Sequence, residues 1–137
     1  MTKISKIITC FFLALNLLSC TLEDDPLNPA DDRDAFLGGW NVIESCSKDA
    51  YTVNISKDPS NSSQVIIENF ALIGYNEKPP YAIIAGSTIT IPKQLVCDDE
   101  SIEVAGSGKL DKGTIELEYT FNDGADLLSC SANYEKP

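Results

Sequence analysis

The amino-acid sequence predicts an all-β protein, an antiparallel eight-stranded up-and-down barrel that follows a disordered N-terminal tether. Residues 114–121 (TIELEYTF) alternate strictly between apolar and polar side chains, which is typical of a strand with one buried and one solvated face. The connections between such runs are mostly short and rich in turn formers, and no segment has a convincing helical period. Eight strands in a meander can close into a barrel without exposed edges, and a two-sheet sandwich is the alternative. Gly106-Ser107-Gly108 favours the barrel, because glycines let a strand bend sharply.

Residues 1–19 have the layout of a secretory signal. Lys3 and Lys6 form a positive start, and the apolar stretch 7–18 is shorter than the roughly 20 residues that span a bilayer. The segment Leu17-Leu18-Ser19-Cys20 resembles the lipobox of bacterial lipoproteins. That resemblance implies that Cys20 is acylated as the first residue of the mature chain, and two or more acyl chains give stable membrane anchoring. The alternative is an ordinary signal peptide in which Cys20 is incidental.

Residues 20–35 are predicted to form an acidic tether. The segment holds six acidic residues together with Pro26 and Pro29, and charge and proline keep such a chain extended and disordered. A solvated spacer is the simplest interpretation. In addition, Glu23-Asp24-Asp25 resembles the acidic export signal of Bacteroidetes lipoproteins that are moved to the cell surface. This resemblance implies the outer membrane and its outer face, with the periplasmic face as the alternative.

Residues 36–137 form one predicted barrel domain. A single helical turn at most is expected before the first strand, within Asp31–Leu37. Two prolines in Asn76–Pro80 exclude a central strand there. The short turns elsewhere predict antiparallel hairpins between consecutive strands. The predicted strands are Trp40–Cys46, Tyr51–Lys57, Val65–Ile73, Tyr81–Ala85, Thr88–Cys97, Ser101–Lys109, Thr114–Phe121 and Ala125–Tyr134.

The composition excludes several classes of function. The formal net charge is −11, and loss of Lys3 and Lys6 with the leader takes it to −13, so nucleic acid is not an expected partner. The chain has no histidine, which rules out Ser-His-Asp and Cys-His catalysis and removes the commonest zinc ligand. Glu116 and Glu118 should lie on a solvated strand face and residues 98–100 in a solvated turn, where acids have little catalytic or calcium-binding use. We therefore expect a protein that is not an enzyme and has no cofactor or metal.

Three motifs carry a resemblance to a known family. Gly38-Gly39-Trp40 matches the G-x-W signature at the start of lipocalin barrels, Gly106-Ser107-Gly108 lies late in the domain, and Cys130-Ser131-Ala132-Asn133-Tyr134 ends it. With these motifs, residues 36–136 resemble the small lipocalin-like (calycin-type) lipoproteins of Bacteroidetes. Lipocalins usually carry a late arginine that packs over the tryptophan, whereas the only arginine here is Arg33. Either Lys136 takes that place or no residue does.

Three cysteines remain once Cys10 has left with the leader and Cys20 is acylated: Cys46, Cys97 and Cys130. The envelope is oxidising, so a disulfide is expected, and three pairings are possible. We prefer Cys46–Cys130, because the first and last strands of a closed meander are neighbours. The chain-entropy model gives such a long loop about 4 kcal/mol of stabilisation. Cys97 would then be an unpaired, inert thiol whose pKa is raised by the acidic residues 98–100.

The inner face of the predicted barrel supplies the candidate binding residues. Alternation turns Val42, Val53, Ile55, Ile115 and Leu117 inward together with the candidate ligand-lining residues Trp40, Tyr51, Tyr119, Phe121 and Tyr134. These side chains either fill the barrel or line a small apolar cavity with tyrosine hydroxyls as polar handles. No arginine and few lysines can reach the interior, which predicts a neutral or cationic ligand. Glu44 also faces inward by alternation and is expected at the barrel mouth, with a bulge that turns it outward as the alternative and no role assigned.

Two functional hypotheses follow. The first is a membrane-anchored lipoprotein whose lipocalin-like barrel binds a small neutral ligand, or a glycan or host protein. The second is a barrel that acts through its surface, as a protease inhibitor or an accessory subunit of an envelope complex. A continuous internal cavity would favour the first hypothesis, and a filled core with an exposed apolar patch would favour the second.

Overall fold

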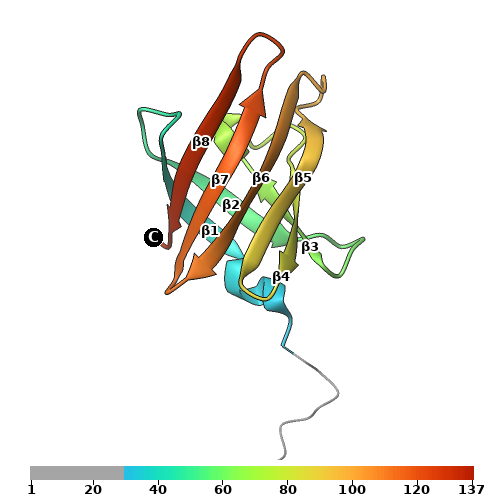
Figure 1. Cartoon of the computed structure of the whole chain (residues 1–137). Coiled ribbons are helices and arrows are strands. Elements are labelled where there is room, and N and C mark those ends of the chain that lie inside the picture. Colours follow the sequence, from blue (N-terminus) through green and yellow to red (C-terminus); the bar gives the residue numbers. More distant parts are fainter. Residues whose placement is uncertain (1–29) are drawn as a thin grey trace, which may run out of the picture.

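The computed structural model describes residues 30–137, which form a closed eight-stranded antiparallel barrel in which every strand pairs with its neighbours in sequence (Figure 1). The predicted leader, Cys20 and the predicted tether up to residue 29 lie outside the described residues. Two 3-10 helices accompany the strands, η1 (Asp32–Phe36) and η2 (Phe70–Leu72). The strands are β1 (Gly38–Glu44), β2 (Tyr51–Lys57), β3 (Gln64–Glu68), β4 (Tyr81–Ala85), β5 (Thr88–Val96), β6 (Ile102–Asp111), β7 (Thr114–Asn122) and β8 (Leu127–Glu135).

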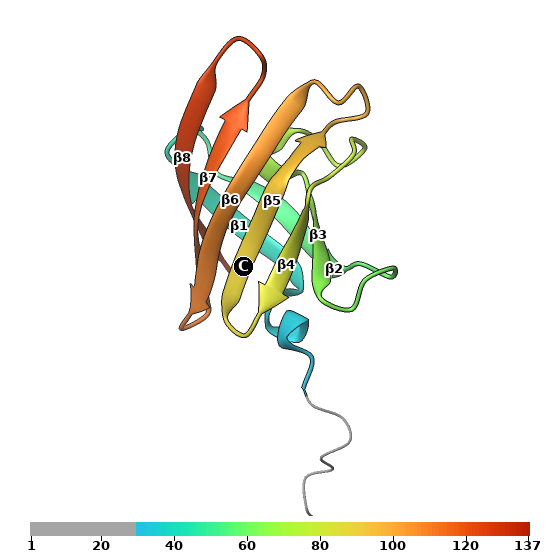
Figure 2. The same ribbon diagram turned by 45° about the vertical axis from the view of Figure 1, so that its right-hand side comes forward.

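The pairing of β1 with β8 closes the barrel and decides between the two predicted architectures. The register runs antiparallel from Asn41 opposite Glu135 to Glu44 opposite Ala132. The first and last strands are therefore neighbours, which confirms the up-and-down barrel and excludes the sandwich. Figure 2 shows the strands crossing one another steeply on opposite sides of the barrel, as strand tilt requires in a small closed sheet.

The third strand is shorter than predicted. The sequence predicts a strand over Val65–Ile73, but β3 ends at Glu68 because Asn69 takes a left-handed conformation with φ of 60°. Asparagine tolerates this conformation, and here its side-chain amide donates to the Thr52 carbonyl at 2.8 Å and accepts from the Gly74 N–H at 3.1 Å. Side-chain hydrogen bonds have replaced the strand ladder, and the chain turns over the barrel end as η2.

The apolar alternation of the strands builds one core inside the barrel. The inward residues of β1, β2 and β7 named above are buried, except Tyr51 and Phe121, which are partly exposed near one end. Most of the core residues are 0–2% exposed and so leave almost no surface that a water molecule could touch. The largest of these fully buried side chains are Phe36, Trp40, Ile55, Ile67, Phe70, Ile89, Ile91, Ile115, Leu117 and Tyr134.

Gly106 and Gly108 allow β6 to lie unusually close to β7. A Cβ atom on Gly106 would lie 2.6 Å from the Cβ atom of Tyr119, and one on Gly108 would overlap the backbone carbonyl of Glu116. Any side chain at either position would push the two strands apart. The two glycines, which were predicted to let the strand bend, thus allow the backbone of β6 to lie close to that of β7.

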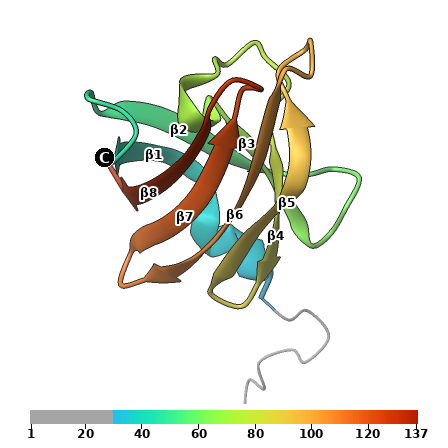
Figure 3. The same ribbon diagram turned by 45° about the horizontal axis from the view of Figure 1, so that its top comes forward.

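Helix η1 closes one end of the barrel, which we call the closed end (Figures 1 and 3). Phe36 is fully buried, and the Trp40 indole N–H donates to its carbonyl at 2.7 Å. Arg33 donates to the carbonyls of Asn61 and Gln64, so η1 also holds the β2–β3 turn. The extended tether predicted for residues 20–35 therefore gives way to folded structure at Asp31, within the range expected for a helical turn.

Candidate functional site

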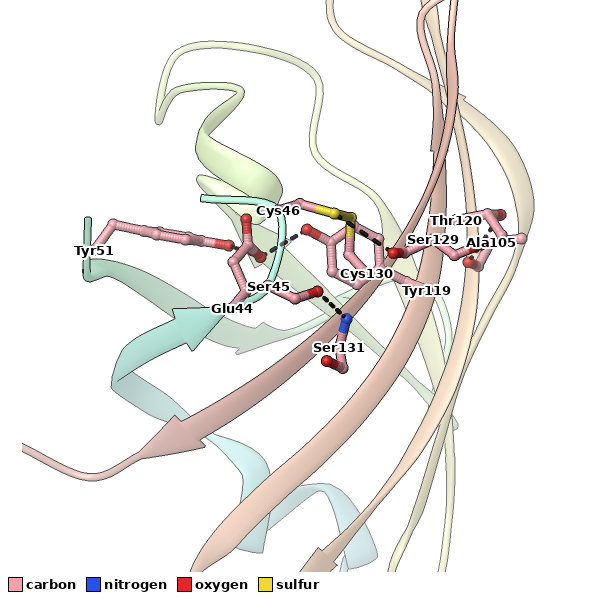
Figure 4. Close-up of a disulfide and its surroundings, with 10 residues drawn as sticks. All are labelled: Glu44, Ser45, Cys46, Tyr51, Ala105, Tyr119, Thr120, Ser129, Cys130 and Ser131. Carbon is pink, nitrogen blue, oxygen red and sulfur yellow. Dashed lines mark hydrogen bonds between the residues drawn. A yellow bond between two sulfur atoms is a disulfide. The ribbon is translucent and has the colours of Figure 1, made fainter. Parts of the chain in front are cut away.

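A carboxylate and two tyrosines meet at the other end of the barrel, which we call the mouth. Glu44 is the last residue of β1, Tyr51 begins β2 and Tyr119 lies in β7. Glu44 Oε2 accepts a hydrogen bond from the Tyr51 hydroxyl at 2.7 Å and another from the Tyr119 hydroxyl at 2.6 Å. One carboxylate oxygen thus joins three strands (Figure 4).

Both tyrosines remain protonated in this environment. Burial raises the pKa of Tyr51 and of Tyr119, and in each case the nearby Glu44 raises it further. A phenol that is harder to ionise stays a hydrogen-bond donor at all physiological pH values. The donation from Tyr51 and Tyr119 to Glu44 is therefore permanent under those conditions.

A third tyrosine lies deeper in the barrel. Tyr134, in β8, is paired with Val42 of β1 and is 1% exposed, and its hydroxyl is buried without a hydrogen-bond partner among the described residues. Burial raises the pKa of Tyr134, and the charge of Glu44 raises it further. A buried polar group left without a partner costs about 1–3 kcal/mol, which is uncommon in a folded protein. We call Glu44, Tyr51 and Tyr119 the mouth cluster.

The mouth cluster opens into a pocket of about 330 Å³, the mouth pocket. Glu44 and Tyr119 form its polar part, and the Cys46–Cys130 disulfide lies along its wall. Leu72, Phe121 and Leu128 supply apolar walls, and Lys48 lies exposed at the rim. An apolar hollow with a few converging polar groups is the usual form of a small-molecule site.

Helix η2 forms the floor and one wall of this end. Phe70 is fully buried and its ring meets the edge of the Tyr119 ring at a centroid distance of 4.8 Å. Leu72 follows with φ of 61° and is 51% exposed at the pocket. The accessible hollow is therefore confined to the mouth, above a barrel whose interior side chains are tightly packed.

The disulfide holds the β1–β8 seam beside the mouth cluster. Cys46 is bonded to Cys130, with their Cα atoms 5.4 Å apart, as barrel closure predicted. Between them and Glu44, the Ser45 N–H donates to the Ser131 carbonyl and the Ser131 N–H donates to the Ser45 hydroxyl, each at 2.9 Å. Figure 4 shows the disulfide and the Ser45–Ser131 contact near Glu44. Both links tie β1 to β8 next to the mouth cluster.

The structure separates the sequence-predicted lining residues into two groups. Tyr51, Tyr119 and Phe121 belong to the mouth cluster or the mouth pocket, whereas Tyr134 is buried in the core and does not line the pocket. Trp40 does not line this pocket, because it is buried at the closed end and bonded to Phe36. Its position in the chain, at the start of β1, places it more than half a strand away from Glu44.

Glu44 is the residue that sequence reasoning left without a role. Alternation correctly turned it inward and placed it at the mouth. Its tyrosine partners could not be identified from the chain, because Tyr119 lies 75 residues away and meets Glu44 only through the closed sheet. The sequence did show that an acidic residue falls on the same inward face of the first strand as Trp40 and Val42.

The acidic residues and Cys97 occupy the surroundings expected for them. Glu116 and Glu118 are exposed on the outer face of β7, and residues 98–100 are exposed in the β5–β6 turn. Cys97 is a free, buried thiol. Its pKa is raised, chiefly by burial and then by Glu77, Asp99 and Asp98, whereas Glu100 does not contribute to the predicted effect.

A larger hollow of about 610 Å³ lies on the outer face of β6–β8. Its walls are outward-facing polar side chains, among them Ser107, Lys109, Glu116 and Glu118. This surface is open and its charges are solvated, so it offers neither apolar enclosure nor a buried polar group. The mouth pocket is the better candidate despite its smaller volume.

Comparisons with protein-family models, curated proteins and solved structures found no match to this chain. Within residues 30–137 there is no helix long and apolar enough to cross a membrane. The same residues contain no group of three or more His, Cys, Asp or Glu side chains placed to hold a metal ion.

Proposed function

We propose that this chain is a lipid-anchored envelope lipoprotein whose lipocalin-like barrel binds a small neutral or cationic ligand in the mouth pocket. The mouth cluster carries this proposal. A half-buried carboxylate and the two phenol donors bonded to it lie at a hollow with apolar walls. Fully solvated acids elsewhere on the barrel have no such arrangement.

The N-terminal segment joins the barrel at the end opposite the mouth, which supports a lipid-anchored role. The described chain starts at the closed end, where η1 packs, and the mouth lies at the opposite end (Figure 1). A tether from Cys20 would therefore reach the barrel at the end away from the pocket. An anchor on the outer membrane would leave the mouth facing away from the lipid, towards extracellular ligands if the protein lies on the cell surface and towards periplasmic ones otherwise.

The packed interior sets the size of the ligand. Lipocalin-like binding deep within the barrel would need a continuous cavity, but most of the interior side chains are 0–2% exposed. The ligand therefore sits at the mouth and is small. A fatty-acid carboxylate would meet Glu44 without a buried cationic partner, which disfavours anionic lipids.

The anchor is tested at the N-terminus of the mature protein. Mass spectrometry of the N-terminal peptide should find Cys20 as the first residue, carrying a diacylglycerol. A peptide that retains residues 1–19, or one that starts elsewhere without lipid, would exclude the lipoprotein assignment.

Ligand binding is tested on the protein purified from its own host. Native mass spectrometry should detect a retained neutral or cationic small molecule, and a competition screen should show that neutral lipids displace it better than anionic ones. Preferential displacement by anionic lipids would refute this part of the proposal.

A second function is favoured by one observation, the exposed apolar side chains at the mouth end. Leu72 is 51% exposed, Leu127 is 69% exposed and Leu128 is 45% exposed. Together with a filled core, they fit a barrel that acts through its surface, as a protease inhibitor or an accessory subunit of an envelope complex. Co-purification of a stoichiometric protein partner, lost on Leu127→Ser and Leu128→Ser substitution, would support this alternative.

A further inference from the structure

We propose that the mouth pocket recognises a protonated primary amine with an apolar tail, and that Glu44 is the counter-ion of its ammonium group. This inference rests on the proposed ligand-binding function and names the chemical class of the ligand. It follows from the hydrogen-bonding capacity that remains in the mouth cluster.

The mouth cluster has few donors left to offer. The hydroxyl hydrogens of Tyr51 and Tyr119 are both directed at Glu44 Oε2. What remains is acceptor capacity: the lone pairs of Glu44 Oε1 and those of the two phenol oxygens. A ligand that matches this set must donate hydrogen bonds, and an ammonium group has three N–H donors and no acceptor.

The charge of Glu44 also favours an ammonium group over a neutral donor. An ammonium placed on a carboxylate forms a charge-assisted hydrogen bond, which is roughly twice as strong as a neutral one. Because Glu44 is half-buried, solvent screens this attraction less than it would at a fully solvated site. Lys48 is the one cation that lines the pocket, and it is exposed at the rim, where solvent screens its repulsion of a bound ammonium.

The walls of the pocket define the rest of the ligand. Leu72, Phe121 and Leu128 line the pocket together with Glu44. These apolar surfaces fit an aliphatic or aromatic tail next to the ammonium group. A polar amine such as an amino sugar would leave them without a complementary partner.

The test compares three probes of equal length on the form that begins at residue 21. This form contains the whole barrel and its core, which are built from residues 32–135. Hexylammonium, hexan-1-ol and hexanoate are titrated at neutral pH, and the backbone amide shifts of Ser47 and Leu72 are followed by NMR. We expect hexylammonium to bind at least about tenfold more tightly than hexan-1-ol, and hexanoate to bind most weakly.

Two matched variants assign the effect. Glu44→Gln keeps an acceptor for the tyrosines but removes the charge, and should abolish the preference for the amine over the alcohol. Asp49→Asn removes the same charge from an exposed residue five positions along the chain, and should leave the preference unchanged. A fourth probe, hexyltrimethylammonium, has the charge without N–H donors and should bind more weakly than hexylammonium to the unsubstituted protein, a comparison that does not depend on the folding of either variant.

The outcomes separate this inference from the proposed function. If the alcohol binds as well as the amine, if Glu44→Gln keeps the preference, or if Asp49→Asn loses it to the same extent, amine recognition by Glu44 is overturned while the pocket stands. Equal binding of hexyltrimethylammonium and hexylammonium would likewise overturn the role of the N–H donors. If no probe shifts the amides of the mouth pocket, both the inference and the proposed ligand site fail.

Discussion

The ammonium Nζ of Lys136 lies 3.8 Å from the centre of the Trp40 ring. The same ammonium donates to the Leu37 carbonyl at 2.5 Å, and the Trp40 indole N–H donates to the Phe36 carbonyl. One lysine next to the C-terminus therefore covers the tryptophan that begins the barrel. This is the position for which the sequence offered either Lys136 or no cation.

Substitution of Lys136 should weaken the closed end. Lys136→Met removes the cation over the ring and the hydrogen bond to Leu37, and we expect a loss of about 1 kcal/mol, since exposed cation–π pairs contribute about 0.5–1 kcal/mol. Urea unfolding followed by tryptophan fluorescence measures the change at Trp40 itself. Lys109→Met, on the outer face of β6, is the control and should leave the midpoint in place; an equal loss in both variants would argue against a specific Trp40 contact.

The disulfide should contribute a large share of the stability. Replacing Cys46 and Cys130 by serine frees a loop with a sequence separation of 84, and we expect the free energy of unfolding to fall by about 2–4 kcal/mol. Urea denaturation of the two forms gives this difference. Cys97→Ser leaves the disulfide intact and should have a smaller effect, while a non-reducing peptide map that joins Cys97 to either partner would contradict the pairing.

The close approach of β6 and β7 should make Gly108 intolerant of substitution. Gly108→Ala places a methyl group against the Glu116 carbonyl, and strands that must shift to accommodate it typically lose about 1–3 kcal/mol. Thermal unfolding compares this variant with Gly39→Ala, where an added Cβ meets no atom within 4 Å. Similar melting temperatures for the two variants would show that β6 and β7 are not constrained at this point.

The contact between η1 and β2 should be sensitive to acid. Hydrogen bonds from Arg33 and then from Lys57 hold the pKa of Asp31 well below its ordinary value. Because the folded pKa is depressed, the stabilisation is present above the unfolded pKa of about 3.9 and is lost as the pH falls below it. The difference in urea midpoint between the unsubstituted protein and Asp31→Asn, which keeps an N-cap oxygen, should be constant near neutral pH and shrink below about pH 4. A difference that stays constant into acid would mean that Asp31 contributes no charge interaction.

Cys97 should be unreactive while the protein is folded. Its thiol is buried, and burial followed by the acidic neighbours raises its pKa, which lowers the fraction of reactive thiolate. Alkylation by iodoacetamide at neutral pH should be slow in the native protein and fast in urea. Equal rates in both states would show that the β5–β6 turn opens readily.

The sequence by itself determined the eight strands, apart from the end of β3, together with their inward faces and the pairing of consecutive strands. Period-two alternation is a local property, and short turns leave a strand little choice but to pair with the next one, so β7 and its buried face could be predicted from residues 114–121 alone. The disulfide also followed, once closure made β1 and β8 neighbours. The predicted lipid anchor at Cys20 depends on the sequence alone and lies outside the described residues.

Only the tertiary structure decided what Glu44 contacts. Its two hydroxyl donors lie 7 and 75 residues away, and the seam that brings them together forms only when the barrel closes. The tertiary structure also decided where β3 ends. Local propensity would continue this strand, but the side-chain hydrogen bonds of Asn69 with Thr52 and Gly74 replace its pairing. Alternation assigns a residue to a face of the sheet, but the neighbours of that residue across the barrel depend on register and closure, which are long-range properties of the whole sheet.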